Sequence, residues 1–413
     1  MIEREPSGFI DFSPNISRRK FLGFAAGIGG IYAAGRIAGP IVEQEYDEWL
    51  SGMSNSEFIK DYAQPISKIH LGASFSPEKF GVRLGPHGKV VGPTDLAMEG
   101  FRYAVDDLNL KHIRLGLMWE NAVDDSGDID LSVYQPFIDY GLEKGVRFCK
   151  NFGYKSLRWP EQHPPSRVNA DAMLAYGSTV GVNTPIGQEA LVYTDNMATY
   201  LSREYGHAIP MIQPENEPFQ KYGIYDQDLG LQYMETSINI INSAFPHAQV
   251  LVNAGGGENV KKLTPFITEL TRKKPHLAGL VVSGIDVHLD NPKMNGLWKA
   301  LGLDTVTVDE LENGDIYSQH RKAARENGIP MEISEAQIES YGSEQSPLYS
   351  VKKLRKILIR CFDILDVKKD DPVSDLRLWG VEDQFLVVKN QGLTPETRRR
   401  IELIQMIASR QAA

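Results

Sequence analysis

Short apolar runs of five to eight residues recur along the chain from residue 69 onward, and longer stretches with apolar residues at helical spacing separate them. These runs predict strands at 69–75, 112–118, 146–152, 209–214, 249–253, 279–286, 330–334 and 376–381. The intervening stretches predict helices at 95–108, 132–144, 188–205, 228–243, 260–273, 317–327, 348–363 and 394–411. This alternation is typical of parallel β/α units. Eight strands, each followed by a helix, predict a single (β/α)8 barrel over residues 68–413, with its site at the carboxyl ends of the strands.

Three connections in this pattern are long and rich in glycine, proline and polar residues, at 76–94, 153–187 and 287–315. Each follows a predicted strand. In a (β/α)8 barrel the loops after the strands surround the site, so we expect these three connections to shape a substrate cleft.

The first 40 residues differ from the rest. Residues 17–23 read SRRKFLG, and the apolar, glycine-rich run FAAGIGGIYAAG follows. The pair Arg18 and Arg19 in this setting resembles a twin-arginine signal, which implies recognition by the Tat export machinery and a periplasmic or extracellular destination. Because Arg36 ends the apolar run early, a cleaved signal is favoured, although a retained membrane anchor stays open. Residues 41–67 are charged and predict a linker or a lead-in helix packed on the barrel.

Composition limits which partners the protein can bind, and it says less about the reaction that the protein catalyses. Hydrophobic residues make up 42% of the chain and charged residues 24%, which are ordinary values for a globular protein. The formal net charge of −10 disfavours nucleic acid as a partner and suits a neutral substrate. The two cysteines, Cys149 and Cys361, predict buried thiols rather than a disulfide framework. We expect a monomer without a cofactor, and the histidine spacings predict no catalytic metal.

Two predicted strands end in acidic corners. The fourth runs into Glu215, Asn216 and Glu217 in the segment IPMIQPENEPF, and the seventh runs into Glu335 in PMEISEAQ. Side chains at such strand ends face the mouth of a barrel. The glycines at 255–257 lack the spacing of a phosphate-binding loop and indicate a permissive turn.

An Asn-Glu pair after strand four and a glutamate after strand seven resemble glycoside hydrolase clan A, which contains the family 5 cellulases and mannanases. The resemblance implies that Glu217 is the acid/base, that Glu335 is the nucleophile, and that Asn216 holds the sugar 2-hydroxyl. Six further residues are candidates for contact with the substrate. Arg114 of strand two resembles the arginine that orients the nucleophile, His288 after strand six resembles an active-site histidine, and Trp379 of strand eight resembles the sugar platform. Trp159, in the loop after strand three, is a candidate sugar contact without a family motif, as are Trp119 and Tyr154.

Glycoside cleavage explains why two carboxyls are required. A proton must reach the leaving oxygen while negative charge stabilises the anomeric carbon from the opposite face, and one acid cannot do both. Glu215 and Glu332 are rivals in the same segments, and strand alternation makes Glu332 a member of a buried polar network. A catalytically silent carbohydrate-binding barrel and a transglycosidase with the same dyad remain alternatives.

Overall fold

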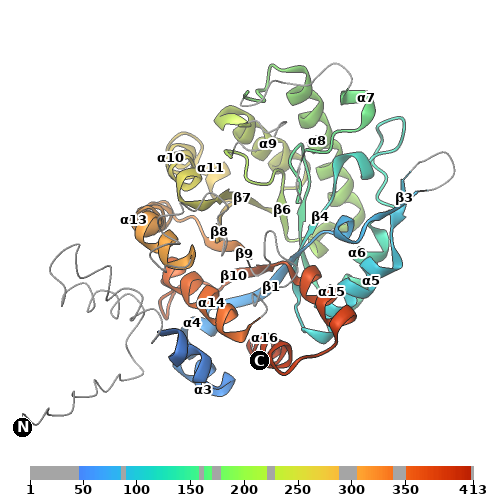
Figure 1. Ribbon diagram of the computed structural model, residues 1–413. Coiled ribbons are helices and arrows are strands. Elements are labelled where there is room, and N and C mark those ends of the chain that lie inside the picture. The colour runs from blue at the N-terminus through green and yellow to red at the C-terminus, as the bar shows by residue number, and fades with distance from the viewer. Residues whose placement is uncertain are drawn as a thin grey trace, which may run out of the picture.

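Eight parallel strands close into a barrel, and helices surround it (Figure 1). The computed structural model describes residues 46–84, 90–157, 162–169, 178–220, 228–287, 305–337 and 350–410. The barrel strands are β1 (Ile69–Phe75), β4 (His112–Gly116), β5 (Arg147–Asn151), β6 (Met211–Gln213), β7 (Gln249–Gly255), β8 (Val281–Val287), β9 (Met331–Gln337) and β10 (Ser374–Trp379). Each strand pairs in parallel with its neighbours in sequence, and β1 closes on β10. The (β/α)8 fold and the eight strands are therefore confirmed.

The longer helices lie outside the barrel close to their predicted positions, with one exception. They are α5 (Asp95–Arg102), α6 (Gln135–Glu143), α8 (Pro185–Tyr205), α9 (Gly230–Ala244), α10 (Gly256–Lys273), α13 (Thr305–Glu326), α14 (Val351–Leu365) and α16 (Pro395–Ser409). The exception is α13, which begins at Thr305 rather than at 317, so part of the predicted connection 287–315 is helical. A π-helical turn, η3 (Tyr103–Asp107), extends α5. The short helices are η1 (Pro77–Phe80), η4 (Trp119–Asn121), α7 (Ser166–Asn169), η5 (Gly206–Ala208) and α11 (Pro275–Ala278). The sequence did not predict the antiparallel hairpin β2 (Val82–Leu84) and β3 (Val90–Pro93), nor α15 (Val381–Gln391).

Strand alternation separates an apolar outer face from a largely polar interior. On β1, for example, Leu71, Ala73 and Phe75 are buried in the main core, which lies between the strands and the surrounding helices. One apolar cluster stands apart from that core and consists of Cys149, Met211, Leu251 and Val282. Arg377 of β10 reaches across the barrel to the sulfur of Met211, so this cluster lies inside the barrel. This cluster separates the polar side chains at the amino ends of the strands from those at the carboxyl ends. We call the end of the barrel at which the carboxyl ends of the strands lie the mouth.

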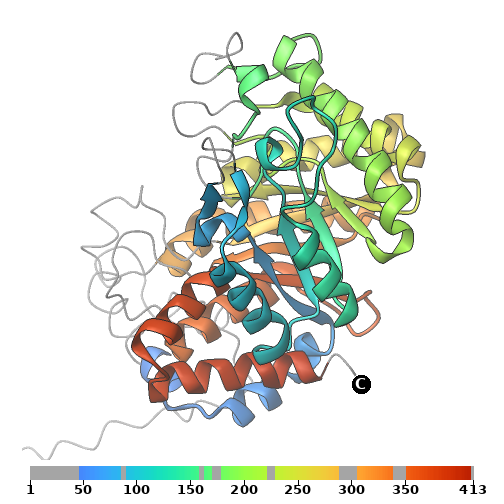
Figure 2. The same ribbon diagram turned by 90° about the vertical axis from the view of Figure 1, so that its right-hand side faces the viewer.

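The segment before β1 is helical and packs on the outside of the barrel. Residues 46–52 form one helix, followed by α3 (Asn55–Asp61) and α4 (Ala63–Ile66). Arg355 of α14 donates to the carbonyl oxygen of Leu50 at 2.6 Å, and α3 lies beside α16 (Figure 2). The proposed export signal, residues 1–40, lies outside the described residues.

Two further findings concern the chain as a whole. Both cysteines are buried and free, as predicted. No helix within the described ranges is long and apolar enough to span a membrane.

Candidate active site

The structure brings four of the predicted site residues together at the mouth. Arg114 lies on β4, Asn216 and Glu217 follow β6, and Glu335 lies on β9. Trp379 ends β10. The other two predicted residues, Trp159 and His288, lie outside the described residues.

Arg114 is the centre of this arrangement. Its side chain is fully buried, and one terminal nitrogen, Nη1, donates to the Glu335 carboxylate at 2.6 Å. The other, Nη2, donates to the Asn216 amide oxygen at 2.5 Å, while Nε donates to Gln213 at 2.5 Å. The guanidinium therefore fixes both Glu335 and Asn216, and its planar geometry sets their relative orientation. The contact to Glu335 is the one expected from the sequence.

Two amide side chains, Gln213 and Asn253, complete this network, and the sequence analysis did not predict either of them. The side-chain oxygen of Asn253, on β7, accepts from Gln213 at 2.6 Å and from the backbone N–H of Glu217 at 2.9 Å. Its nitrogen donates to the Asn216 oxygen at 3.2 Å. The Asn216 oxygen thus accepts two hydrogen bonds inside the protein, so this amide is held with its oxygen turned towards Arg114 and Asn253. Such an orientation suits an amide that donates through its nitrogen.

Glu217 is held in an uncommon backbone conformation. Its φ is 42°, in the left-handed region that non-glycine residues rarely adopt, and its side chain is buried. The carboxyl group lies against Gly255 at the end of β7. A Cβ atom added at Gly255 would lie 1.6 Å from Oε1 of Glu217, so glycine leaves the space that this carboxyl occupies. Strained backbone of this kind clusters at functional sites, because the surrounding structure must enforce it.

A β-bulge turns Glu335 into the barrel. Ile333 pairs in register with Ile285 of β8, but the next β8 residue, Asp286, pairs with Glu335. One residue of β9, Ser334, is thereby extra, and the pairing with β10 shifts at the same place. In a regular strand Glu332 and Glu335 would point to opposite faces. The bulge lets both point inward, Glu332 to an ion pair with Arg377 deeper in the barrel and Glu335 to Arg114.

Asp286 is a third acidic side chain at the mouth and was not predicted. It ends the inward face of β8, is fully buried, and accepts from Asn253 at 2.6 Å and from Ser334 at 2.5 Å. Burial, followed by the negative charges of Glu335 and Glu217, raises the pKa of Asp286 well above its usual range. The two predicted catalytic carboxyls are therefore near enough to Asp286 to act on it electrostatically. The one available signal was its place at the end of the sixth predicted strand.

Glu215 serves to hold the backbone. Its buried carboxyl accepts from the backbone N–H groups of Tyr154 and Lys155, at 3.1 and 2.6 Å, and from the Tyr233 hydroxyl at 2.7 Å. Burial raises the pKa of Glu215 to about 8, although these three donors act in the opposite direction. The group connects the loop after β5 to α9 and does not belong to the Arg114 network.

The aromatic candidates differ in their surroundings. Trp379 is 6% exposed and pairs in register with Gln337 of β9, so it lies at the mouth, and its role as a sugar platform stays a prediction. Trp119 is fully buried and stacks on Tyr193 of α8, with ring centroids 5.0 Å apart. It is a core residue and not a platform.

No protein-family model matches the sequence, and no curated protein matches it in sequence. Solved structures do share the fold. Xylanase 10B from Thermotoga petrophila RKU-1, solved with xylobiose, is 13% identical with a TM-score of 0.51, covering 88% of this chain and 99% of its own. Native xylanase 10B from Thermotoga maritima is 14% identical with a TM-score of 0.52, covering 86% and 98%.

A third similar structure is the exo-beta-1,4-mannosidase Op5Man5 from Opitutaceae bacterium strain TAV5. It is 14% identical with a TM-score of 0.50, and the match covers 84% of this chain and 60% of the mannosidase. At such identities the similarity establishes the barrel fold, whereas function has to be argued from the side chains at the mouth.

Proposed function

We propose that the chain is a retaining glycoside hydrolase of clan A that cleaves β-glycosidic bonds by double displacement. The observation that carries the proposal is the double contact of Arg114, which donates at once to the Glu335 carboxylate and to the Asn216 amide oxygen. This contact supports a nucleophile that is oriented by an ion pair and lies beside a sugar-binding amide. The xylanases and the mannosidase that share the fold are glycoside hydrolases by name and favour the same reaction class.

In the first step Glu335 attacks the anomeric carbon while Glu217 gives its proton to the leaving oxygen. In the second step Glu217 takes a proton from water, which attacks the glycosyl-enzyme and releases the sugar with its configuration retained. Asn216 donates to the 2-hydroxyl, and Arg114 keeps Glu335 in the direction of attack. Asp286 holds Asn253 and Ser334, so its role in the reaction is to position Asn216, the backbone of Glu217, and the bulge that carries Glu335.

The proposed substrate is a β-linked poly- or oligosaccharide. Trp379 would stack on the apolar face of a pyranose, and Trp159 and His288 would add contacts from the loops. Because the similar structures are named as xylanases and a β-1,4-mannosidase, aryl β-xylosides and β-mannosides come first in the substrate panel, followed by β-glucosides. Binding without release would favour a silent carbohydrate-binding barrel, and transfer products at low acceptor concentration would favour a transglycosidase.

The roles of the two glutamates are tested with azide. In Glu217→Ala, a substrate with an activated leaving group still forms the glycosyl-enzyme, which accumulates because base assistance worth about 10²- to 10⁴-fold is missing. Azide attacks that intermediate and gives a sugar azide of retained configuration. In Glu335→Gly no intermediate forms, and azide in the vacated space gives the inverted product. Swapped stereochemistry would reverse the assignment, and full activity in either variant would remove that residue from the mechanism.

We also propose that the protein is exported in folded form by the Tat machinery and acts as a monomer in the periplasm or outside the cell. The segment SRRKFLG supports this route. A soluble polysaccharide substrate is consistent with that destination, and a retained N-terminal anchor is the alternative location.

A further inference from the structure

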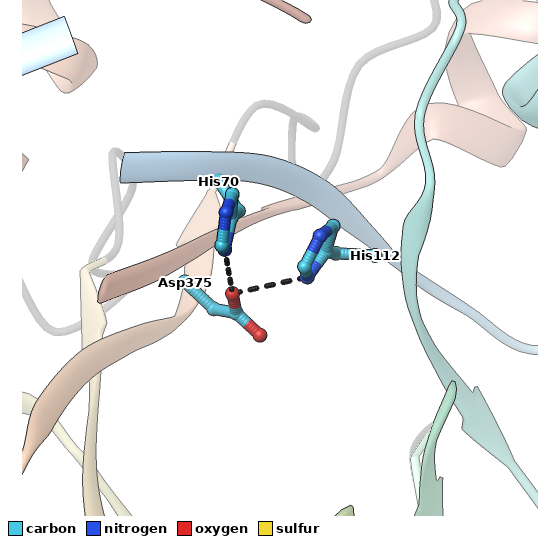
Figure 3. A group of neighbouring side chains, drawn as sticks. All are labelled: His70, His112 and Asp375. Carbon is cyan, nitrogen blue, oxygen red and sulfur yellow. Dashed lines mark hydrogen bonds and ion pairs between the residues drawn. The ribbon is translucent and has the colours of Figure 1, made fainter. Parts of the chain in front are cut away.

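Two histidines and one aspartate meet at the end of the barrel opposite the mouth. His70 lies near the start of β1, His112 begins β4, and Asp375 lies near the start of β10 (Figure 3). Nδ1 of His70 is 3.2 Å from Oδ1 of Asp375, and Nδ1 of His112 is 3.1 Å from the same oxygen. All three ligand atoms lie within 4.8 Å of one another. This is the one such group of potential metal ligands among the residues that the structure describes.

Two of the three spacings between these atoms match those of a tetrahedral metal site. Zinc bonds to histidine nitrogen and carboxylate oxygen at about 2.0 to 2.2 Å, which places neighbouring ligands of a tetrahedron about 3.3 Å apart. Both distances to the Asp375 oxygen are close to this value. Each Nδ1 can donate a proton to that oxygen, and a ring that carries its proton on Nε2 instead presents the Nδ1 lone pair to a cation.

The three side chains are held in place by their neighbours. Arg377 donates to the other Asp375 oxygen, Oδ2, at 2.6 Å, which turns Oδ1 towards the histidines. Arg377 also pairs with Glu332, so its guanidinium is shared between two carboxylates. Such fixing of a ligand carboxylate by an outer partner is typical of metal sites.

The two histidine rings are fixed as well. They stack with centroids 4.2 Å apart and planes at 20°. Gly72 permits β1 to lie close to the start of β4, since a Cβ there would lie 1.9 Å from the carbonyl oxygen of His112. Solvent reaches the group, as the side chains of His70, His112 and Asp375 are 29%, 14% and 15% exposed. An ion can therefore enter, and water can supply a fourth ligand.

We propose that His70, His112 and Asp375 bind one divalent transition-metal ion of the zinc class, with water completing a tetrahedral site. The ion would join the first, second and last strands of the barrel, including the β1–β10 pair at which the barrel closes. Residues at this end of a (β/α)8 barrel serve stability. The site is thus a structural metal site that stabilises the barrel. It is separate from the carboxyls at the mouth and independent of the proposed hydrolase activity.

The test uses the full chain after removal of any histidine tag and treatment with a chelator. Zinc chloride is titrated by calorimetry, and thermal unfolding is followed with and without zinc. The expected result is one saturable site with a Kd of about 10 µM or tighter, and a rise in Tm of about 3 °C or more at saturation. Cobalt(II) should give the intense visible bands of a tetrahedral site rather than the pale colour of the aqueous ion.

The variants are His70→Asn and His112→Asn, because the asparagine nitrogen can keep the hydrogen bond to Asp375 while ligating zinc poorly. Each should weaken zinc binding by at least about 30-fold and remove the rise in Tm. His247→Asn is the matched control. His247 stacks on His207 at 4.5 Å, both are exposed, and no carboxylate within the described ranges forms an ion pair with either, so this change should leave binding unaltered. Unchanged zinc binding in His112→Asn, loss of binding in His247→Asn, or no saturable site in the wild type would each overturn the proposal.

Discussion

The close approach of the Glu217 carboxyl to Gly255 allows the role of Glu217 to be tested by adding one methyl group at position 255. In Gly255→Ala the new Cβ would lie 1.6 Å from Oε1 of Glu217 and 2.5 Å from Oε1 of Gln220. Both are the ends of flexible side chains, so the backbone can stay in place while the Glu217 carboxyl moves by about 1.5 Å. We therefore expect Tm to change by no more than about 2 °C. A displacement of about 1 Å can cost 10²-fold in rate, and acid/base catalysis contributes about 10²- to 10⁴-fold, so turnover should fall within that range.

The assay compares two substrates of the same sugar. One has a leaving group that needs protonation, and the other has an activated aryl group that does not. The rate of glycosyl-enzyme formation should fall much less with the second substrate. Gly279→Ala is the control, because its nearest atoms would lie 3.9 and 4.0 Å from the added Cβ. If Gly255→Ala kept turnover on the demanding substrate within about threefold of wild type, the carboxyl of Glu217 would not be the working acid. Equal losses on both substrates would also refute the reasoning.

Three other predictions concern Arg114, stability against acid, and export. Arg114→Met leaves the buried Glu335 carboxylate without its cation, which lowers folding stability by about 3 to 5 kcal/mol. Because the proposed nucleophile also loses its orienting contact, kcat should fall at least about 10²-fold with KM little changed. Arg355→Met, a buried arginine away from the mouth, should lower Tm and keep kcat, and equal kcat losses would contradict the orienting role. Burial lowers the pKa of His320 from 6.5 to about 4, so its neutral form contributes about 3 kcal/mol to the free energy of unfolding above pH 6.5, lost as pH falls towards 4. Chemical denaturation at pH 7 and pH 4.5 should show a loss of stability in wild type that exceeds the loss in His320→Gln by about 2 to 3 kcal/mol, and equal losses would contradict this reasoning. Replacing Arg18 and Arg19 by lysine should retain the protein in the cytoplasm, and unchanged yield outside it would show that the signal was misread.

The barrel could be predicted because its strands have an apolar outer face and its helices repeat at a regular interval. The elements that sequence reasoning missed lack such a signal. Strands β2 and β3 are three and four residues long, and they pair with each other rather than with the barrel. Helix α15 lies directly between β10 and α16. The β/α pattern requires a single helix after the last strand, and α16 already filled that place in the prediction.

The candidate site could be predicted only in part, for a similar reason. Strand order placed Glu217 and Glu335 at one end of the barrel. Alternation, however, assigns Glu335 to the face opposite Glu332. The bulge at Ser334 turns Glu335 to the same face, and nothing in the sequence PMEISEAQ indicates a bulge. Gln213 and Asn253 are polar residues within apolar runs, and their importance emerges only when closure of the barrel brings them together. The same holds for the three metal-ligand candidates, which come from three distant strands and have no local spacing to recognise.

The left-handed backbone of Glu217 has a consequence for the evolution of this chain. A side chain at φ 42° makes the folded state less stable by about 1 to 2 kcal/mol, whereas glycine adopts this conformation readily. Glu217→Gly should therefore be more stable than Glu217→Ala, against the usual order of the two residues. Selection for heat resistance alone would favour replacement of the residue that we propose as the acid/base. A search for thermostable variants of this barrel must score catalysis in the same round, or it will enrich chains that survive heating and no longer act.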